Sequence, residues 1–327
     1  MKYLIAATLT FFCITTICIA QTTTSVILSK TLTGHSEPVN CLSYSPDGKL
    51  LASGSDIVGL NEPDSGKFEI IIWSIDDFKI LGHLTGHKDA IQSISFNKTG
   101  TKLVSSDSKG EIKIWDVKNL NAIKSITGGN WVNTITLTPD DRYIIGEYTF
   151  EKKVSLWDFE TGEMISTLNV NQQIGSMDIS PDGSKIALSC YHKIQVWSLI
   201  SNKQLLSIDD LFARGFAIKY SPDGKDLAVG MGEGEIKFFD PETLILKFIL
   251  QGHFNAVLSV SFNKTGKYLV SGSSDQMIKI WSLQSKKEVK SLVNFHKGTV
   301  QSVAFNPISN IFATTGIDKT IKIWKIQ

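Results

Sequence analysis

The sequence predicts an all-β fold, a seven-bladed β-propeller with four antiparallel strands in each blade. Two observations predict it: a turn motif of the Ser-Pro-Asp-Gly type recurs about every 42 residues, and short apolar runs separate the motifs. The second residues of the seven motifs are Pro46, Lys98, Pro139, Pro181, Pro222, Lys264 and Pro307. Apart from the first, the spacings are 41 to 43 residues, so we expect seven copies of one structural unit.

Each turn motif suits a tight hairpin corner. In the first motif Pro46 fixes φ, Asp47 can cap the turn, and Gly48 tolerates a positive φ. The runs around the corners are rich in valine, isoleucine, leucine, phenylalanine and tryptophan and are bounded by turn residues, which is typical of β-strands. One unit, for example, contains the runs 256–262, 268–273, 277–281 and 288–293, which indicates four strands.

The first unit is longer than the others. Residues 56–69 are polar, contain glycine and proline, and lengthen the unit by about ten residues. We expect an inserted loop in blade one.

The 327-residue chain has a balanced charge. With 42% hydrophobic residues it can bury a large core, and 20% charged residues are too few for a disordered chain. The formal net charge is +1, and the lysines are spread over nearly every predicted strand. This distribution creates no field that would attract nucleic acid or an anionic membrane. We therefore expect no nucleic-acid partner.

Residues 1–20 have the layout of a secretory signal peptide. One lysine precedes an apolar stretch, and the small residues Cys18 and Ala20 come just before Gln21, as at a cleavage site. The sequence predicts export of residues 21–327, as a secreted or periplasmic protein. The alternative is an uncleaved N-terminal membrane anchor, because the apolar stretch approaches the roughly 20 residues that span a bilayer. We expect no membrane span after signal removal.

Two further signals lie in register with the corners. Gly-His pairs precede the first strand of a unit at Gly34-His35, Gly86-His87 and Gly252-His253, and Phe295-His296 matches in part. An aromatic residue ends every third strand: Trp73, Trp115, Trp157, Trp197, Phe239, Trp281 and Trp324. An aspartate follows three of them, at Asp116, Asp158 and Asp240. On these residues the chain resembles the WD-repeat β-propeller family over its whole predicted mature length.

The resemblance implies a buried His–Asp–Trp hydrogen-bond network in a blade. Two sets are complete: His253, Asp275 and Trp281, with Ser271 or Ser273 as the hydroxyl partner, and His296, Asp318 and Trp324. In blade two Asp107 lies two positions early, and Lys109 occupies the expected place. In blade one the insertion obscures which aspartate, if any, takes part.

Blades three to five depart further from the family pattern. They lack the histidine and carry Glu151, Tyr191 and Glu233 where the aspartate is expected. We expect these blades to be less rigid than the others.

The resemblance also implies how the ring closes. The sequence stops after three strands of blade seven, and residues 24–32 form a spare strand before blade one. In the resembled family such a segment completes the last blade, which removes the open sheet edges. We expect a monomeric ring.

No catalytic motif is consistent with the repeat. The sequence contains no GxSxG, HExxH, CxxC or P-loop pattern. Histidines that recur in register with a buried tryptophan are better explained as hydrogen-bonding groups of the scaffold. We predict a protein that is not an enzyme, with no metal site and no cofactor.

The candidate binding residues flank the first strand of each blade, because partners of the resembled family commonly bind around the central channel. They are Asn40, Gln92, Trp131, Asn133, Arg214, Phe216 and Gln301. Trp131 is the one tryptophan outside the repeat register, and tryptophan and arginine often dominate binding energies. Alternatively, Trp131 covers the gap left by Gly129 at a histidine position.

These observations favour a non-catalytic module outside the cytoplasm that binds another protein or a peptide. The alternative is a small-ligand-binding or enzymatic propeller that acts at the channel mouth, where Asn40, Gln92, Asn133 and Gln301 would form the lining. A third possibility is a scaffold that binds through its rim and residues 56–69.

Overall fold

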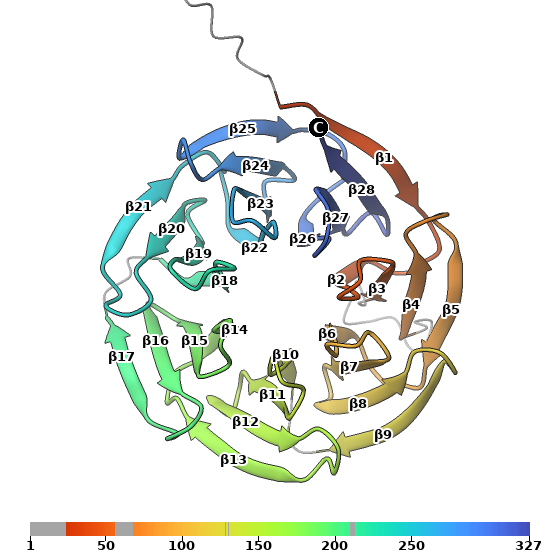
Figure 1. Cartoon of the computed structure of the whole chain (residues 1–327), viewed down its shortest axis with the longest axis vertical. Helices are drawn as coiled ribbons and strands as arrows, with labels where there is room; N and C mark the ends of the chain where they lie inside the picture. The colour runs from red at the N-terminus through yellow and green to blue at the C-terminus, as the bar shows by residue number, and fades with distance from the viewer. Residues whose placement is uncertain (1–23, 56–67, 128, 130, 210–212) are drawn as a thin grey trace, which may run out of the picture.

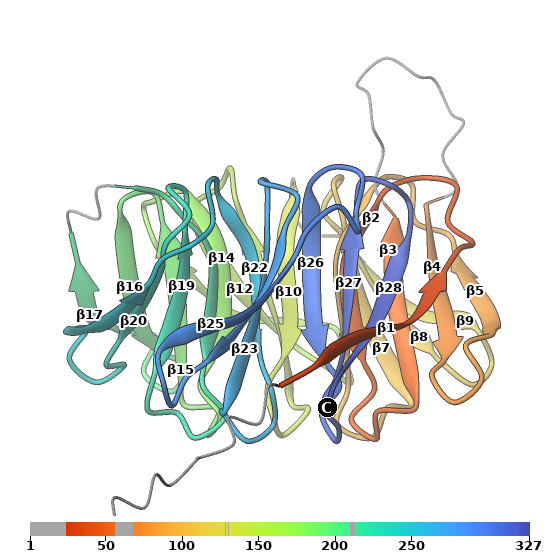
Figure 2. The same ribbon diagram turned by 90° about the horizontal axis from the view of Figure 1, so that it is seen from above.

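The computed structural model describes residues 24–55, 68–127, 129, 131–209 and 213–327. These residues form seven four-stranded antiparallel sheets around a central channel, and they include no helix (Figure 1). Seen from the side, the strands cross the thickness of a disc (Figure 2). The structure confirms the predicted seven-bladed β-propeller.

Within blades one to six the strands follow in chain order from the channel to the rim. Blade one contains β2 (Val39–Tyr44), β3 (Leu50–Ser55), β4 (Glu69–Ser74) and β5 (Ile80–Thr85). Blade two contains β6 (Ile91–Phe96), β7 (Lys102–Asp107), β8 (Glu111–Asp116) and β9 (Asn121–Thr127). Blade three contains β10 (Val132–Leu137), β11 (Tyr143–Tyr148), β12 (Lys153–Asp158) and β13 (Met164–Asn169).

The second half of the ring repeats this arrangement. Blade four contains β14 (Ile174–Ile179), β15 (Lys185–Cys190), β16 (Lys193–Ser198) and β17 (Gln204–Ile208). Blade five contains β18 (Gly215–Tyr220), β19 (Leu227–Met231), β20 (Ile236–Phe239) and β21 (Leu246–Leu250). Blade six contains β22 (Val257–Phe262), β23 (Tyr268–Ser273), β24 (Ile278–Ser282) and β25 (Lys287–Leu292).

Blade seven joins the two ends of the described chain. It contains β26 (Val300–Phe305), β27 (Ile311–Gly316), β28 (Ile321–Ile326) and, as its outermost strand, β1 (Val26–Leu32). The antiparallel pairing of β1 with β28 places Val26 opposite Ile326, as expected for a closed ring. A buried hydrogen bond adds to the closure: the Nδ2 atom of Asn306 donates to the carbonyl oxygen of Gly48 at 2.7 Å.

The corners form as their residue types predict. In blade four the Ser180 hydroxyl donates to Asp182 at 2.6 Å, and Gly183 has a φ of 75°. In the Asn-Lys-Thr-Gly corners a buried asparagine replaces the serine, and Asn97 donates to the Thr99 hydroxyl at 2.8 Å. Both kinds of corner therefore make the same tight turn between the first two strands of a blade.

Two predicted segments lie outside the described residues. One is the signal peptide, residues 1–20. The other is the insertion 56–69, of which only Phe68 and Glu69 are described. Glu69 begins β4 and pairs with Thr85 of β5, so the predicted end of the insertion is too late.

The core lies between neighbouring blades. Ile70 and Ile72 of blade one, for example, pack in one cluster with Ile91 and Trp115 of blade two. Near the channel the blades approach so closely that a Cβ atom on Gly54 would lie 2.5 Å from the Cγ2 atom of Ile91. Gly54 therefore has no room for a side chain in blade one, and this constraint bears on the site below.

Candidate binding site at the central channel

Blade six contains a complete buried hydrogen-bond network. The ring nitrogens of His253 lie 2.8 Å from the carboxylate of Asp275 and 2.7 Å from the hydroxyl of Ser271. Trp281 donates its indole N–H to the same hydroxyl at 2.8 Å. The structure thus selects Ser271, because the hydroxyl of Ser273 donates instead to the Asn255 carbonyl.

Blade seven contains the same network with a threonine hydroxyl. The ring nitrogens of His296 lie 3.0 Å from Asp318 and 2.9 Å from Thr314, and Trp324 donates to Thr314 at 3.0 Å. Four side chains thus connect the loop before β26 to β27 and β28.

Blade two corrects the expectation that Asp107 is out of place. The ring of His87 lies 3.1 Å from Asp107 and 2.6 Å from Ser105, and Trp115 donates to Ser105 at 2.7 Å. Asp107 reaches the histidine from the end of β7, while Lys109 lies at the surface. The network is therefore complete in blade two, although its aspartate comes two positions early.

Blade one has the inner half of the network. The hydroxyl of Ser53 lies 2.6 Å from His35 and accepts the indole N–H of Trp73 at 2.8 Å. Burial lowers the pKa of His35 to about 4, and the charge of His83 adds to this effect. The residues where an aspartate would follow β3 lie outside the described part of the chain.

In blade three Tyr148 takes the space of the missing histidine. Its ring lies 5.9 Å from that of Trp157, much as His87 lies 5.7 Å from Trp115. A Cβ atom on Gly129 would come within 2.4 Å of the Tyr148 ring. Tyr148, rather than Trp131, therefore fills the gap beside Gly129. The lower rigidity expected of blades three to five stays a prediction.

A β-bulge lies at the same position in the innermost strand of every blade. The bulged residues are Asn40, Gln92, Asn133, Gly175, Phe216, Leu258 and Gln301. All seven line the central cavity, which has a volume of about 420 Å³. Because a bulge redirects a side chain, this one irregularity aims a residue of each blade into the channel. Five of the predicted binding residues are among the seven.

Three of the four amide side chains in the channel lining bind oxygen atoms of the scaffold. Asn40 donates to the Ile91 carbonyl of the next blade at 3.2 Å, and Asn133 reaches the Gly175 carbonyl at 3.4 Å. Gln92 donates to the Ser108 hydroxyl at 2.7 Å. Within the described part of the chain, the lining includes no carboxylate and no histidine. The lining does include Lys219, whose ammonium group donates to the carboxylate of Asp178 at 2.6 Å.

Trp131 and Arg214 lie outside the channel lining, and the side chain of each contacts the ring of a phenylalanine. Trp131, which is 37% exposed, meets Phe150 edge-to-face at 5.7 Å, and Phe150 is 64% exposed. The guanidinium group of Arg214 lies 4.9 Å from the centre of the Phe216 ring. Sequence reasoning missed Phe150, which follows β11 and is not marked by any repeat position.

Glu147 is a buried acid that the sequence analysis did not identify. It is fully buried, and neither carboxyl oxygen has a hydrogen-bond partner in the described structure. Burial raises its pKa to about 8, and Thr149, Asn133 and the charge of Arg214 oppose that rise. In three other blades the equivalent position is a glycine, which would have indicated that the site is unusual.

One cluster has the composition of a metal site. His87, Asp107 and Glu111 place ligand atoms within 4.8 Å of one another. The cluster is already engaged by the hydrogen bond between His87 and Asp107 and by the ion pair of Glu111 with Lys113 at 2.7 Å. A cation would have to displace these contacts, so we assign the three residues to the stability of blade two.

The closed ring, the repeated networks and the channel lining define a repeat scaffold, a class of protein that presents a rigid surface. The model of the WD40 family, "WD domain, G-beta repeat", matches residues 27–56, 78–116, 245–282 and 286–325. The chain belongs to the WD-repeat family. The matched segments leave out most of blades three to five, which lack the histidine.

Comparison with curated proteins gives the same family. The chain is 30% identical over 271 residues to the "WD repeat-containing protein WDS homolog" of Arabidopsis thaliana, which covers 78% of this chain and 49% of that protein. It is 24% identical over 223 residues to "Periodic tryptophan protein 2" of the same plant, covering 67% of this chain and 24% of the relative. The chain therefore spans half or less of the length of these two relatives.

A third relative is similar in length. The human "Serine-threonine kinase receptor-associated protein" is 22% identical over 299 residues, which are 77% of this chain and 81% of that protein. The WD-repeat relatives support a protein-interaction scaffold, and these three names describe repeat or associated proteins rather than enzymes. Among the residues that the structure describes, no helix is long and apolar enough to cross a bilayer.

Proposed function

We propose that this propeller is a non-catalytic scaffold that binds another protein or a peptide at its channel face. The observation that carries the proposal is a pair of ring contacts beside the starts of the innermost strands β10 and β18: the exposed pair Trp131 and Phe150, and the half-buried pair Arg214 and Phe216. Aromatic and arginine side chains supply most of the binding energy in many interfaces. A rigid ring holds these groups in place before binding, which lowers the entropic cost of association.

The enzymatic or small-ligand alternative has less support. Among the described residues of the channel lining there is no histidine or carboxylate, and the ammonium group of Lys219 is paired with Asp178 at 2.6 Å. Three of the four amides that could hold a small ligand, Asn40, Gln92 and Asn133, already bind scaffold oxygens.

We further propose that the scaffold acts outside the cytoplasm. The support is the layout of residues 1–20, with a lysine, an apolar stretch and small residues before Gln21. Mass spectrometry of the protein from an export-competent cell should give a chain that begins at Gln21. A full-length mass in the membrane fraction would favour the anchor, and a full-length mass in the cytoplasm would contradict export.

The binding face can be tested by a cross-linking pull-down with residues 21–327 as bait. The variant Trp131→Ala/Arg214→Ala/Phe216→Ala should lose partners that the parent captures, because each such side chain can contribute about 2 kcal/mol or more. The matched control is Ile245→Ala/Ile308→Ala, which changes residues that are 66% and 57% exposed at other turns. All three proteins must unfold at comparable temperatures.

Either outcome is informative. Loss of a partner from the triple variant, but not from the control, would support the channel face. Equal capture by all three proteins would contradict it and would turn attention to the rim.

A further inference from the structure

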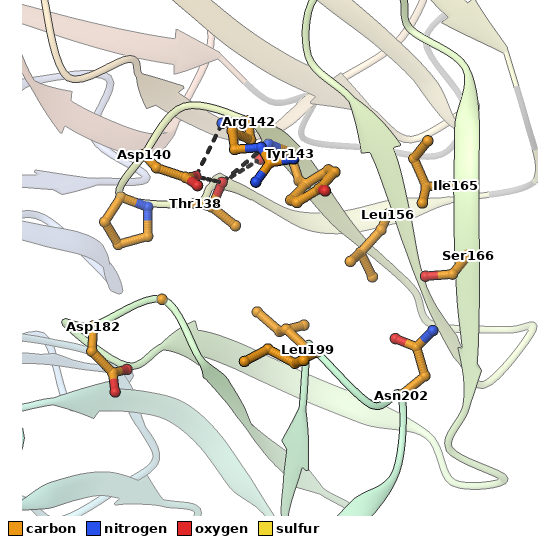
Figure 3. Close-up of a pocket in the computed structure, with 13 residues that line it drawn as sticks. Thr138, Asp140, Arg142, Tyr143, Leu156, Ile165, Ser166, Asp182, Leu199 and Asn202 are labelled. Carbon is orange, nitrogen blue, oxygen red and sulfur yellow. Dashed lines mark hydrogen bonds between the residues drawn. The ribbon is translucent and has the colours of Figure 1, made fainter.

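A cavity of about 600 Å³ lies between blades three and four, and we call it the 3/4 groove. The residues that line it include Leu156, Ile165, Ser166, Leu199, Ile200 and Asn202 (Figure 3). Leu156 and Leu199 lie on opposite sides of it (Figure 3). Ile165 is 55% exposed and Ile200 is 84% exposed, so the apolar lining is open to water.

The repeat shows what fills this place elsewhere in the same ring. Between blades one and two, Leu120 reaches back from the turn after β8 and packs with Ile72 and Val117. It lies so close to β5 that a Cβ atom on Gly82 would be 2.1 Å from its Cδ1 atom. The cavity that remains there has about 300 Å³, half the volume of the 3/4 groove.

Other blades place large apolar residues at the same position. Leu244 of blade five is 3% exposed and packs with Val196 and Leu206 of blade four. Phe78 of blade one packs against the cluster that contains Ile323 of blade seven. The φ angles of Phe78, Leu120 and Leu244 are 58°, 55° and 56°, so one turn geometry presents all three side chains.

Blade four has this turn but lacks the apolar side chain. Asn202 occupies the position with a φ of 56°, and its polar side chain is exposed. Ser166 of blade three is equivalent to Gly82 of blade one, the residue that Leu120 packs against between blades one and two. The same position holds Gly162 in blade three and Lys286 in blade six, where the ammonium group of Lys286 lies 4.5 Å from the centre of the Phe248 ring. The 3/4 groove therefore has the place that an apolar side chain fills in blades one, two and five, and Asn202 leaves it open.

We propose that the 3/4 groove is a second binding site, which takes a leucine-like side chain from a segment of a partner protein. The inserted group would cover Ile165 and Ile200 and remove their apolar surface from water. The charged groups of Asp140, Arg142 and Asp182 at the edge would face polar residues next to the inserted side chain. The site is independent of the channel face, because it is formed by corner turns and outer strands.

The experiment uses a peptide that copies the natural filler. The probe is acetyl-Asp-Val-Lys-Asn-Leu-Asn-Ala-amide, the sequence of residues 116–122, and its control carries serine in place of leucine. Both are titrated to millimolar concentration into the purified protein with labelled isoleucine methyl groups. We expect the leucine peptide to shift the NMR signals of Ile165 and Ile200 and the serine peptide to leave them unchanged.

Two variants test whether the groove itself is the site. Asn202→Leu should fill the groove from within and weaken peptide binding by about tenfold or more, because leucine is accepted at this φ in blades two and five. Ile200→Lys, which introduces the residue type of Lys118 in blade two, should weaken binding similarly. No shift at these methyl groups, equal shifts with the serine peptide, or binding unchanged in Asn202→Leu would overturn the proposal.

Discussion

Replacing Asp107 by alanine is expected to lower the free energy of unfolding by about 3 to 5 kcal/mol. Asp107 is fully buried and accepts hydrogen bonds from the backbone N–H groups of Lys109 and Glu111 at 3.0 and 2.9 Å. Its other oxygen lies 3.1 Å from His87. Burial alone would raise the pKa of Asp107, but these hydrogen bonds hold it below its usual range. Alanine would leave all three donors without their acceptor.

The measurement is urea unfolding of the parent and the variant at neutral pH. Lys109→Ala is the matched control, since Lys109 occupies the position that the family pattern assigns to the aspartate. Its side chain is 65% exposed and pairs with Asp89 at 3.3 Å, so we expect a change below about 1 kcal/mol. Equal losses in the two variants would refute the assignment of Asp107 to the network of blade two.

Asp107 also shows how far the repeat could be predicted from the sequence. Corners, strands and the aromatic residues recur with a constant spacing, so the fold and the number of blades follow from periodicity alone. Periodicity does not predict the position of the aspartate that binds the histidine. A carboxylate at the end of β7 and one in the turn after β23 can reach equivalent histidines. An aspartate can therefore lie two residues away from the expected position and still bind the histidine, although a comparison of sequence positions would score it as missing.

The site was predictable only in part. The repeat register of the sequence predicted which residue of each innermost strand faces the channel. The β-bulge that turns this residue toward the channel has no sequence signature in this chain. Trp131 and Phe150 meet from the segments before β10 and after β11, and Tyr148 meets Trp157 between β11 and β12. All four residues belong to blade three, which the family model does not match. The 3/4 groove was not predictable from the sequence, because it is recognised by comparing the volume of the cavity beside Asn202 with that of the cavity beside Leu120.

The second large effect is expected at Glu147, where replacement by glutamine should flatten the pH dependence of stability. The folded protein holds the pKa of Glu147 at about 8, chiefly through burial, against an ordinary value of 4.5. An acid whose pKa is raised by folding contributes its full stability below pH 4.5, and this contribution is lost as the pH rises toward 8. Between pH 5 and 9 the parent should therefore lose about 4 kcal/mol that the variant retains.

The physical reason lies in the packing of blades three and four. Positions equivalent to Glu147 are glycines in blades one, five and six, where a Cβ atom would lie 2.5 to 2.7 Å from the next blade. The carboxyl group is thus confined between blades, where Thr149, Asn133 and Arg214 offset only part of its desolvation. Across the interface its charge adds to the burial that raises the pKa of the Cys190 thiol to about 12.

The test is urea unfolding of the parent, Glu147→Gln and Glu233→Gln at several pH values from 5 to 9. Glu233 is exposed in blade five, so its replacement should leave the slope of the parent unchanged. The slope is the informative quantity, because a buried glutamine also lacks partners and can change the overall stability at every pH. All other titrating groups are shared, so a difference in slope reports on position 147. Parallel curves for the parent and Glu147→Gln would mean that the carboxyl group is hydrated in solution and that the interface between blades three and four is looser there than the structure shows.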